Sequence, residues 1–183
     1  MTHAFMTTFA DGLGERGVAT LRYQFAYMEN GSRRPDAPKL AHAAVRAATT
    51  EVLRRLPRLP LIAGGKSFGA RMTSQAQALE PLPGVRGLAF IGFPLHPAGK
   101  PAVDRADHLK QVAIPMLFLQ GTRDGLADLE LQPVVTQLGS LATLALFDDA
   151  DHSFHVRARS GRTDAQAMSA MLDSFVRWAE KLT

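Results

Sequence analysis

The sequence contains no cysteine among its 183 residues. Disulfide bonds and thiolate metal ligands are therefore excluded, and nothing in the composition favours secretion. The first ten residues lack a basic start followed by an apolar run, so no signal peptide is indicated. No apolar run approaches the roughly 20 residues that cross a bilayer. We therefore expect a cytoplasmic protein with no membrane association.

Aromatic residues are also few, at 7%, but 46% of the residues are hydrophobic, which is enough for a sizeable core. No repeat or low-complexity stretch is present, so a single domain over residues 1–183 is expected. The formal charge of +4 and the pI of about 9.8 resemble those of nucleic-acid-binding proteins. The basic residues are scattered among acids, however, and only 157–162 is dense. We therefore predict no nucleic-acid partner.

Short apolar runs alternate with amphipathic stretches along the chain. Strands are expected at 19–27, 59–64, 85–93, 114–120 and 142–147, and helices at 3–15, 40–56, 68–79, 126–138 and 163–182. The strands are continuously apolar, which indicates a sheet buried on both faces. The sequence predicts the α/β class: a three-layer α/β/α sandwich with a mostly parallel sheet.

Gly65-Lys66-Ser67-Phe68-Gly69 fits the pattern G-x-S-x-G between an expected strand and an expected helix. Such a sharp strand-to-helix turn lifts the serine hydroxyl above the carboxyl edge of the sheet. Ser67 is therefore the predicted nucleophile, and the N–H of Phe68 is the predicted oxyanion donor. An incidental serine in a glycine-rich turn is the alternative. A phosphate-binding P-loop is excluded because residues 56–62 contain no glycine.

A serine nucleophile needs a base, and the base needs an orienting carboxylate. Such residues are expected in loops after later strands, in the order serine, acid, histidine. His152 follows the run 142–147 and is the predicted base, with His155 as the fallback. The histidines expected to be solvated are His3, His42 and His108.

For the acid, Asp124 follows the run 114–120, one strand before the histidine. Asp128 is the second candidate. Asp149 and Asp151 are interpreted as turn residues beside the base, since aspartate is common in turns.

Four spaced motifs, GGKSFGARM, GFPLHPAGKP, LQGTRD and DADHSF, together resemble the dienelactone-hydrolase-like branch of α/β-hydrolases. More closely, they resemble the family of testis-expressed protein 30 and the hydrolase-like region of the KAT8 regulatory NSL complex subunit 3. The segment LRYQFAYME is similar to a strand of that family. The resemblance implies an α/β-hydrolase fold and the triad Ser67, Asp124 and His152.

Two features depart from that family. Ala70 stands where a second glycine is usual, and alanine is expected to fit a helix there. The family also has a strand and a His-Gly-rich loop before its first helix, and we expect this chain to lack both. That loop would donate a second backbone N–H to the oxyanion, besides the N–H of Phe68. Loss of one such donor typically lowers the rate by about 10²–10³. We favour a true start further upstream. One alternative is that the expected strand 19–27 takes the place of the missing strand in the sheet. The other is that a second copy of the chain pairs with the sheet, which would form a homodimer.

The sequence thus predicts a serine hydrolase that acts on an ester or acyl bond of a small-molecule substrate. No metal or cofactor is required for this chemistry. Tyr27, His96 and Lys100 are candidates to line the substrate pocket because they lie in or beside the loops 28–38 and 94–100. The alternative is a non-catalytic binding or scaffold protein that retains the fold.

Overall fold

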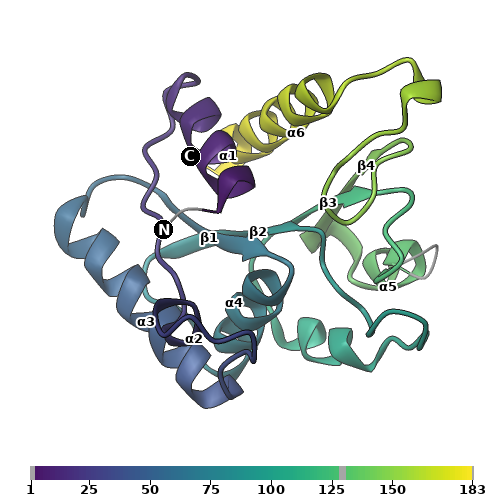
Figure 1. Cartoon of the computed structure of the whole chain (residues 1–183). Helices are drawn as coiled ribbons and strands as arrows, with labels where there is room; N and C mark the ends of the chain where they lie inside the picture. The colour runs from purple at the N-terminus through teal and green to yellow at the C-terminus, as the bar shows by residue number, and fades with distance from the viewer. Residues whose placement is uncertain (1–2, 128–130, 183) are drawn as a thin grey trace.

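A computed structural model describes residues 3–127 and 131–182 of the chain. Within them, four strands form one sheet in the order β1-β2-β3-β4, and every neighbouring pair is parallel (Figure 1). The strands are β1 (Leu61–Lys66), β2 (Val85–Ile91), β3 (Met116–Gly121) and β4 (Ala142–Phe147). All four carboxyl ends therefore meet at one edge of the sheet.

The two central strands are buried on both faces, as their uninterrupted apolar sequences require. All six residues of β3 are buried, and so are six of the seven residues of β2. By contrast, only Ala63 of β1 is fully buried. This difference follows from the position of β1 at the edge of the sheet.

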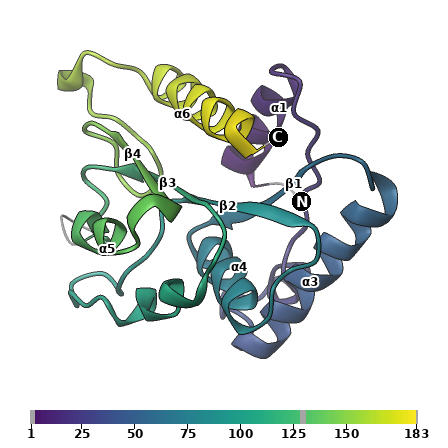
Figure 2. The same cartoon turned by 180° about the vertical axis from the view of Figure 1, so that it is seen from behind.

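Helices cover both faces of the sheet, which gives three layers (Figures 1 and 2). One face carries α1 (Ala4–Gly14) and α6 (Asp164–Ala179). The other carries α3 (Pro38–Arg55), α4 (Phe68–Leu79), α5 (Leu131–Gln137) and the 3₁₀ helix η1 (Asp104–Gln111). Two hydrophobic clusters fill the spaces between the sheet and these two layers. None of the helices in the described residues is both long and apolar enough to cross a membrane.

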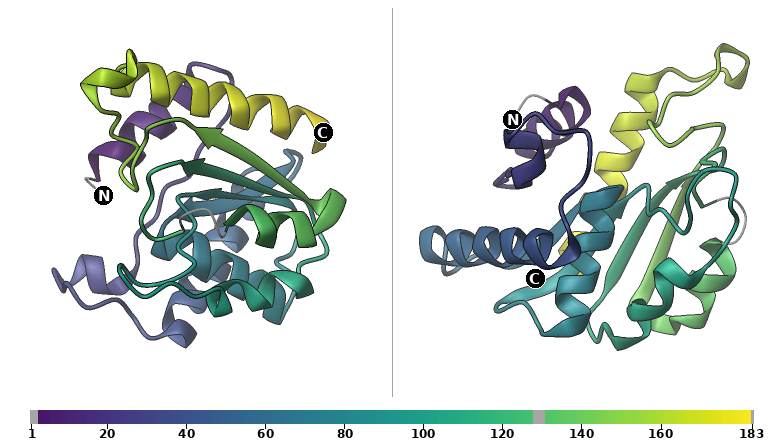
Figure 3. Two further views of the ribbon diagram at one scale, coloured as in Figure 1. Left: turned by 90° about the vertical axis from the view of Figure 1, so that its right-hand side faces the viewer. Right: turned by 60° about the horizontal axis from the view of Figure 1, so that its bottom comes forward.

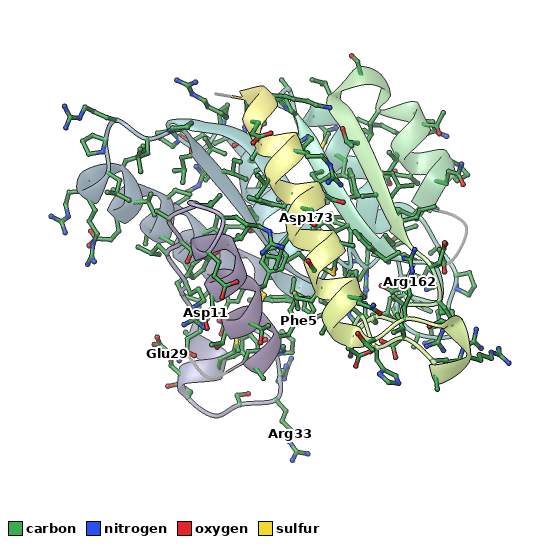
Figure 4. The ribbon with its side chains drawn as sticks, turned by 90° about the horizontal axis from the view of Figure 1, so that it is seen from above. Phe5, Asp11, Glu29, Arg33, Arg162 and Asp173 are labelled. Atoms are coloured by element: carbon green, nitrogen blue, oxygen red, sulfur yellow. The ribbon has the colours of Figure 1, made fainter. Side chains whose placement is uncertain are left out.

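Local signals fix the ends of several helices. Pro38 opens α3, since the missing N–H of proline costs nothing in a first turn. Thr163 and Gln166 form a reciprocal capping box at the start of α6. From above, α6 and α1 lie side by side (Figure 4), and Arg16, just after α1, donates to Asp173 of α6 at 2.8 Å. The last helix therefore holds the first one against the sheet.

Most expected elements are confirmed. The predicted helix 68–79 and strand 142–147 have the bounds of α4 and β4. The other three confirmed strands differ by one or two residues at their ends. Part of the expected helix 126–138 lies outside the described residues, and α5 forms its second half.

The expected strand 19–27 is wrong. Residues 18–25 form no regular structure, and Tyr27 lies in the short helix α2 (Ala26–Glu29). This segment runs from α1 past the β1 side of the sheet to the opposite layer (Figures 1 and 3). Its residues favour a strand, but a strand needs a partner for its backbone hydrogen bonds, and no described strand pairs with this segment.

A groove of about 860 Å³ lies along the outer edge of β1. Its walls are apolar residues of α1, α3 and α6, residues 17–23, and β1 itself from Leu61 to Gly65. No strand among the described residues pairs with this edge. The backbone groups of β1 that point away from β2 therefore face the groove.

Candidate active site

The turn between β1 and α4 places Ser67 at the carboxyl edge of the sheet. Its backbone has φ 52° and ψ −112°, a strained conformation for a residue with a side chain. The Ser67 N–H donates to the carbonyl of Ile91 at 2.9 Å, which holds the turn against β2. Gly65 is required here, because a Cβ would lie 2.8 Å from the carbonyl carbon of Gly69.

Three side chains meet at this edge in a continuous chain of hydrogen bonds. The Ser67 Oγ lies 2.9 Å from His152 Nε2, and His152 Nδ1 lies 2.7 Å from Asp124 Oδ2. The three residues follow β1, β4 and β3 respectively. The structure thus brings together the three residues nominated from their order along the chain.

Asp124 is 1% exposed and its carboxylate is fully engaged. Its Oδ1 accepts the N–H of Leu126 at 3.0 Å, and its Oδ2 accepts from Gln120 Nε2 at 2.6 Å as well as facing His152. Gln120 in turn accepts the N–H of Phe93 at 3.0 Å through its Oε1. Sequence reasoning missed Gln120; its only signal was a polar residue at the end of an otherwise apolar strand.

The loop that carries His152 is held by ionic and backbone contacts. Asp149 accepts from Arg157 and lies 3.3 Å from the Nε of Arg123. Asp151 Oδ1 accepts the N–H groups of Ser153 and His155 at 2.8 and 3.1 Å. These contacts confirm the interpretation of both aspartates as turn residues beside the base.

Gly92 lies directly beneath the imidazole. It has φ +60°, and a Cβ there would lie 3.3 Å from two atoms of the His152 ring. A side chain at this position would therefore crowd the ring. This contact was not predicted, since nothing in the sequence relates Gly92 to His152.

Lys66, the residue before Ser67, reaches the same loop. Its Nζ donates to the carbonyl oxygen of His152 and lies 5.0 and 5.4 Å from the ring centroids of Phe5 and Phe154. Burial lowers the pKa of this amine to about 8, against the opposing effects of the Asp124 and Asp151 carboxylates. The Lys66 side chain therefore links the end of β1, which precedes Ser67, to the backbone of His152.

Phe68 begins α4, so its N–H has no acceptor within the helix and lies next to Ser67. The Phe68 ring packs against Phe25 and Tyr27, with centroids 5.1 and 5.8 Å away. Tyr27 is thus beside the serine turn, and its assignment to the substrate pocket stays a prediction.

The other two predicted pocket residues differ in exposure. His96 is 1% exposed, and its Nδ1 lies 2.9 Å from the carbonyl of Pro97. Lys100, in the same loop, is exposed. Their assignment to substrate binding stays a prediction.

Two histidines expected to be solvated are not, and that expectation was wrong. His42 Nε2 lies 3.2 Å from Gln75 Oε1, and His108 Nε2 lies 2.7 Å from Ser74 Oγ. Burial, followed by the charge of Arg71, lowers the pKa of His108 to about 4. Both side chains lie between α4 and a packed neighbour, a tertiary contact that helical periodicity does not reveal.

The remaining candidates lie apart from the triad or outside the description. His3 is exposed, as expected. His155, the alternative base, is exposed, and its Nδ1 lies 2.9 Å from Asp164 Oδ2, which raises its pKa. Asp128, the second candidate for the acid, lies outside the described residues. Across 3–127 and 131–182, no three His, Asp or Glu side chains are placed to hold a metal ion.

A family model described as an alpha/beta hydrolase domain matches residues 1–180. The chain belongs to this family. The four-stranded parallel sheet with helices on both faces is that of an α/β-hydrolase fold.

Solved structures of other α/β hydrolases resemble this one over nearly its whole length. A serine hydrolase homologue from Coxiella burnetii is 24% identical, with a TM-score of 0.73 over 97% of this chain and 76% of that chain. A serine hydrolase from Xanthomonas campestris, described as having no lid, is 25% identical, with a TM-score of 0.73 over 97% and 75%. A dienelactone hydrolase from Anabaena variabilis is 19% identical, with a TM-score of 0.75 over 99% and 80%.

Proposed function

We propose that this chain is a serine hydrolase that cleaves an ester or similar acyl bond in a small-molecule substrate. The observation that carries the proposal is the hydrogen-bonded series Ser67, His152 and Asp124, with distances of 2.9 and 2.7 Å. Such a series activates a hydroxyl that is otherwise a poor nucleophile at neutral pH. The serine hydrolase from Xanthomonas campestris, which is 25% identical, supports the same reaction class.

In the proposed reaction, Ser67 Oγ attacks the acyl carbon while His152 Nε2 takes its proton. Asp124 holds the imidazole in the tautomer with the proton on Nδ1 and stabilises the imidazolium that forms. His152 then protonates the leaving group, and water repeats the sequence to release the acyl product. The N–H of Phe68, at the positive end of α4, stabilises the oxyanion. No step needs a metal or a cofactor.

Within the α/β-hydrolase family, we further propose that the chain belongs with the testis-expressed protein 30 and KAT8 regulatory NSL complex subunit 3 group. The combination of the four spaced motifs GGKSFGARM, GFPLHPAGKP, LQGTRD and DADHSF supports this narrower placement.

A fluorophosphonate probe tests the serine assignment directly. We expect the folded protein to be labelled at Ser67, as located by peptide mass spectrometry. Ser67→Ala, which keeps the rest of the site, is expected to abolish labelling. The matched control is Ser169→Ala on α6, which removes a hydroxyl distant from the triad and should label like the wild type.

A scaffold or binding protein is the second candidate function. It is favoured by the site itself, because Phe68 contributes only one of the two oxyanion donors that such hydrolases use. Hydrolysis of short p-nitrophenyl esters separates the two functions. If wild type and Ser67→Ala hydrolyse these esters at equal rates, the hydrolase proposal fails and the scaffold function is supported.

A further inference from the structure

A buried glutamine connects the end of β2 to the proposed acid. Just past β2, the Gly92 N–H donates to the carbonyl of Leu119 on β3 at 2.9 Å. The next N–H along the chain, that of Phe93, donates instead to the side chain of Gln120, with its Oε1 at 3.0 Å. Gln120 is 2% exposed, and a buried backbone N–H without an acceptor is costly. The glutamine side chain therefore takes over from the backbone ladder at this point.

This contact fixes the orientation of the Gln120 amide. A backbone N–H can only donate, so the amide atom that faces Phe93 has to be the oxygen. The other amide atom is then the nitrogen, which can only donate, and it lies 2.6 Å from Asp124 Oδ2. Asp124 Oδ1 faces another group that can only donate, the N–H of Leu126 at 3.0 Å. Both carboxylate oxygens of Asp124 are therefore held as acceptors.

The same direction continues to the proposed nucleophile. His152 Nδ1 lies 2.7 Å from Asp124 Oδ2, and because that oxygen accepts, Nδ1 has to carry the proton. His152 Nε2 is then the unprotonated nitrogen of the neutral ring, and it lies 2.9 Å from Ser67 Oγ. This tautomer is the one that can take the proton of the hydroxyl. The series from Phe93 to Ser67 thus has a single direction, set by a backbone N–H that cannot be reversed.

We propose that Gln120 is a positioning residue that fixes the tautomer of His152 by holding Asp124 as an acceptor. The glutamine is buried and acts only through the carboxylate, so it touches no reacting atom. Without its N–H, Oδ2 would be free to turn or to take up a proton, and either change would allow the ring to place its proton on Nε2. This inference rests on the proposed hydrolase function and adds a residue to the same site.

The tautomer can be measured directly by ¹⁵N NMR of the imidazole, without any substrate. In the wild type, at a pH where the ring is neutral, Nδ1 should give the signal of a protonated nitrogen and Nε2 that of an unprotonated one. Gln120→Met keeps the length of the side chain but removes both of its hydrogen bonds, so the two signals should move toward each other. The signals of His152 are assigned by their loss in His152→Gln. A wild-type ring with its proton on Nε2, or an unchanged ring in Gln120→Met, would overturn the proposal.

Gln120→Glu provides a readout that a purely structural role would not move. A glutamate keeps the acceptor for the Phe93 N–H, but its second oxygen donates to Asp124 only while it is protonated. Two carboxyl groups this close share a proton, which is lost as the pH rises. The ratio of kcat for the variant to kcat for the wild type should therefore fall by about tenfold to a hundredfold from about pH 5 to about pH 9, because a hydrogen bond to a charged group contributes that much.

Two features of this assay separate positioning from other effects. With p-nitrophenyl butyrate as the substrate, KM should be the same in both proteins, since the buried glutamine does not line the substrate pocket. The other charged or titratable groups around the site are present in both proteins, so their titration cancels in the ratio; they are Asp124, His152, Asp151 and Lys66.

The matched control is Gln77, a second buried glutamine that accepts a backbone N–H. Its Oε1 accepts from Leu82 at 2.8 Å, near the end of α4 that is remote from Ser67. Gln77→Glu changes the amide in the same way, and its kcat ratio should stay constant over this pH range. A ratio that is also constant for Gln120→Glu would overturn the positioning role. If the wild type hydrolyses no ester and is not labelled at Ser67, while its tautomer still depends on Gln120, the proposed function fails and the positioning role stands.

Discussion

Replacing Lys66 with methionine separates the stability of this protein from its activity. The pKa of the buried amine is about 8, against an ordinary value of 10.5. Below pH 8 the amine is charged in both the folded and the unfolded chain, and the folded state bears the cost of burying that charge. The difference corresponds to about 3 kcal/mol, at 1.36 kcal/mol per pH unit. As the pH rises from 8 to 10.5, the folded state releases its proton first, so its stability increases.

Methionine fills similar space without a charge, so Lys66→Met avoids this cost at every pH. It also loses the bond to the His152 carbonyl and the contacts with Phe5 and Phe154, which offset about 1–2 kcal/mol of the gain. We therefore expect Lys66→Met to be more stable than the wild type by about 1–2 kcal/mol at pH 7. Its kcat should nevertheless fall by about tenfold to a hundredfold, because the loop that carries the base loses its attachment.

Urea unfolding measured from pH 7 to pH 10.5 checks the stability, and p-nitrophenyl ester hydrolysis checks the rate. The exposed Lys39→Met is the matched control and should follow the wild type in both assays. If the stabilities of wild type and Lys66→Met ran parallel between pH 8 and 10.5, the assignment of the burial cost to this amine would be refuted.

Three further changes are expected to have distinct effects. Ser67→Gly should be more stable than Ser67→Ala by about 1 kcal/mol in urea unfolding, because only glycine adopts φ 52° without strain; equal stabilities would argue against strain at the turn. Asp124→Asn should lower kcat by about 10⁴ with the fold retained by circular dichroism, since the amide favours the wrong tautomer of His152; a loss below tenfold would contradict the role of Asp124. The pKa of His108 is about 4, below the ordinary 6.5, so the unfolded chain takes up a proton first as the pH falls. The free energy of unfolding of the wild type should therefore fall by up to about 2 kcal/mol between pH 6.5 and pH 4, a figure reduced for the partial exposure of the ring. His108→Gln should lack this acid dependence, and an unchanged slope in acid unfolding curves would refute its origin in His108.

The elements that the sequence predicts well are those in which one local signal dominates. Helix α4 is bounded by the turn at Ser67 and by Pro81, and β4 by the short 3₁₀ helix Gly139–Leu141 before it and a polar turn after it. The candidate triad could likewise be predicted from the sequence, because in a parallel sheet loops that are distant in sequence meet at one edge. Order along the chain was therefore enough to nominate Asp124 and His152.

What the sequence does not reveal depends on contacts between elements. The segment 19–27 has the composition of a strand, but its structure depends on a neighbour that local pattern cannot supply. Gln120 and Gly92 act on the triad through a side-chain contact and through the absence of a side chain, respectively. His108 and His42 were expected to be solvated because neither lies in a loop at the end of a strand, yet η1, which carries His108, and α3, which carries His42, both pack against α4.

The position of β1 at the edge of the sheet has a consequence for how the protein loses activity. A central strand can detach only if two ladders of hydrogen bonds break, whereas β1 is held by one, to β2. Its other side adjoins a groove rather than a packed layer. Regions of this kind open locally at a lower free energy than the rest of a fold. Because Ser67 directly follows β1, mild heating or low denaturant should displace the serine while the central strands β2 and β3 remain folded, so loss of the proposed activity should precede unfolding.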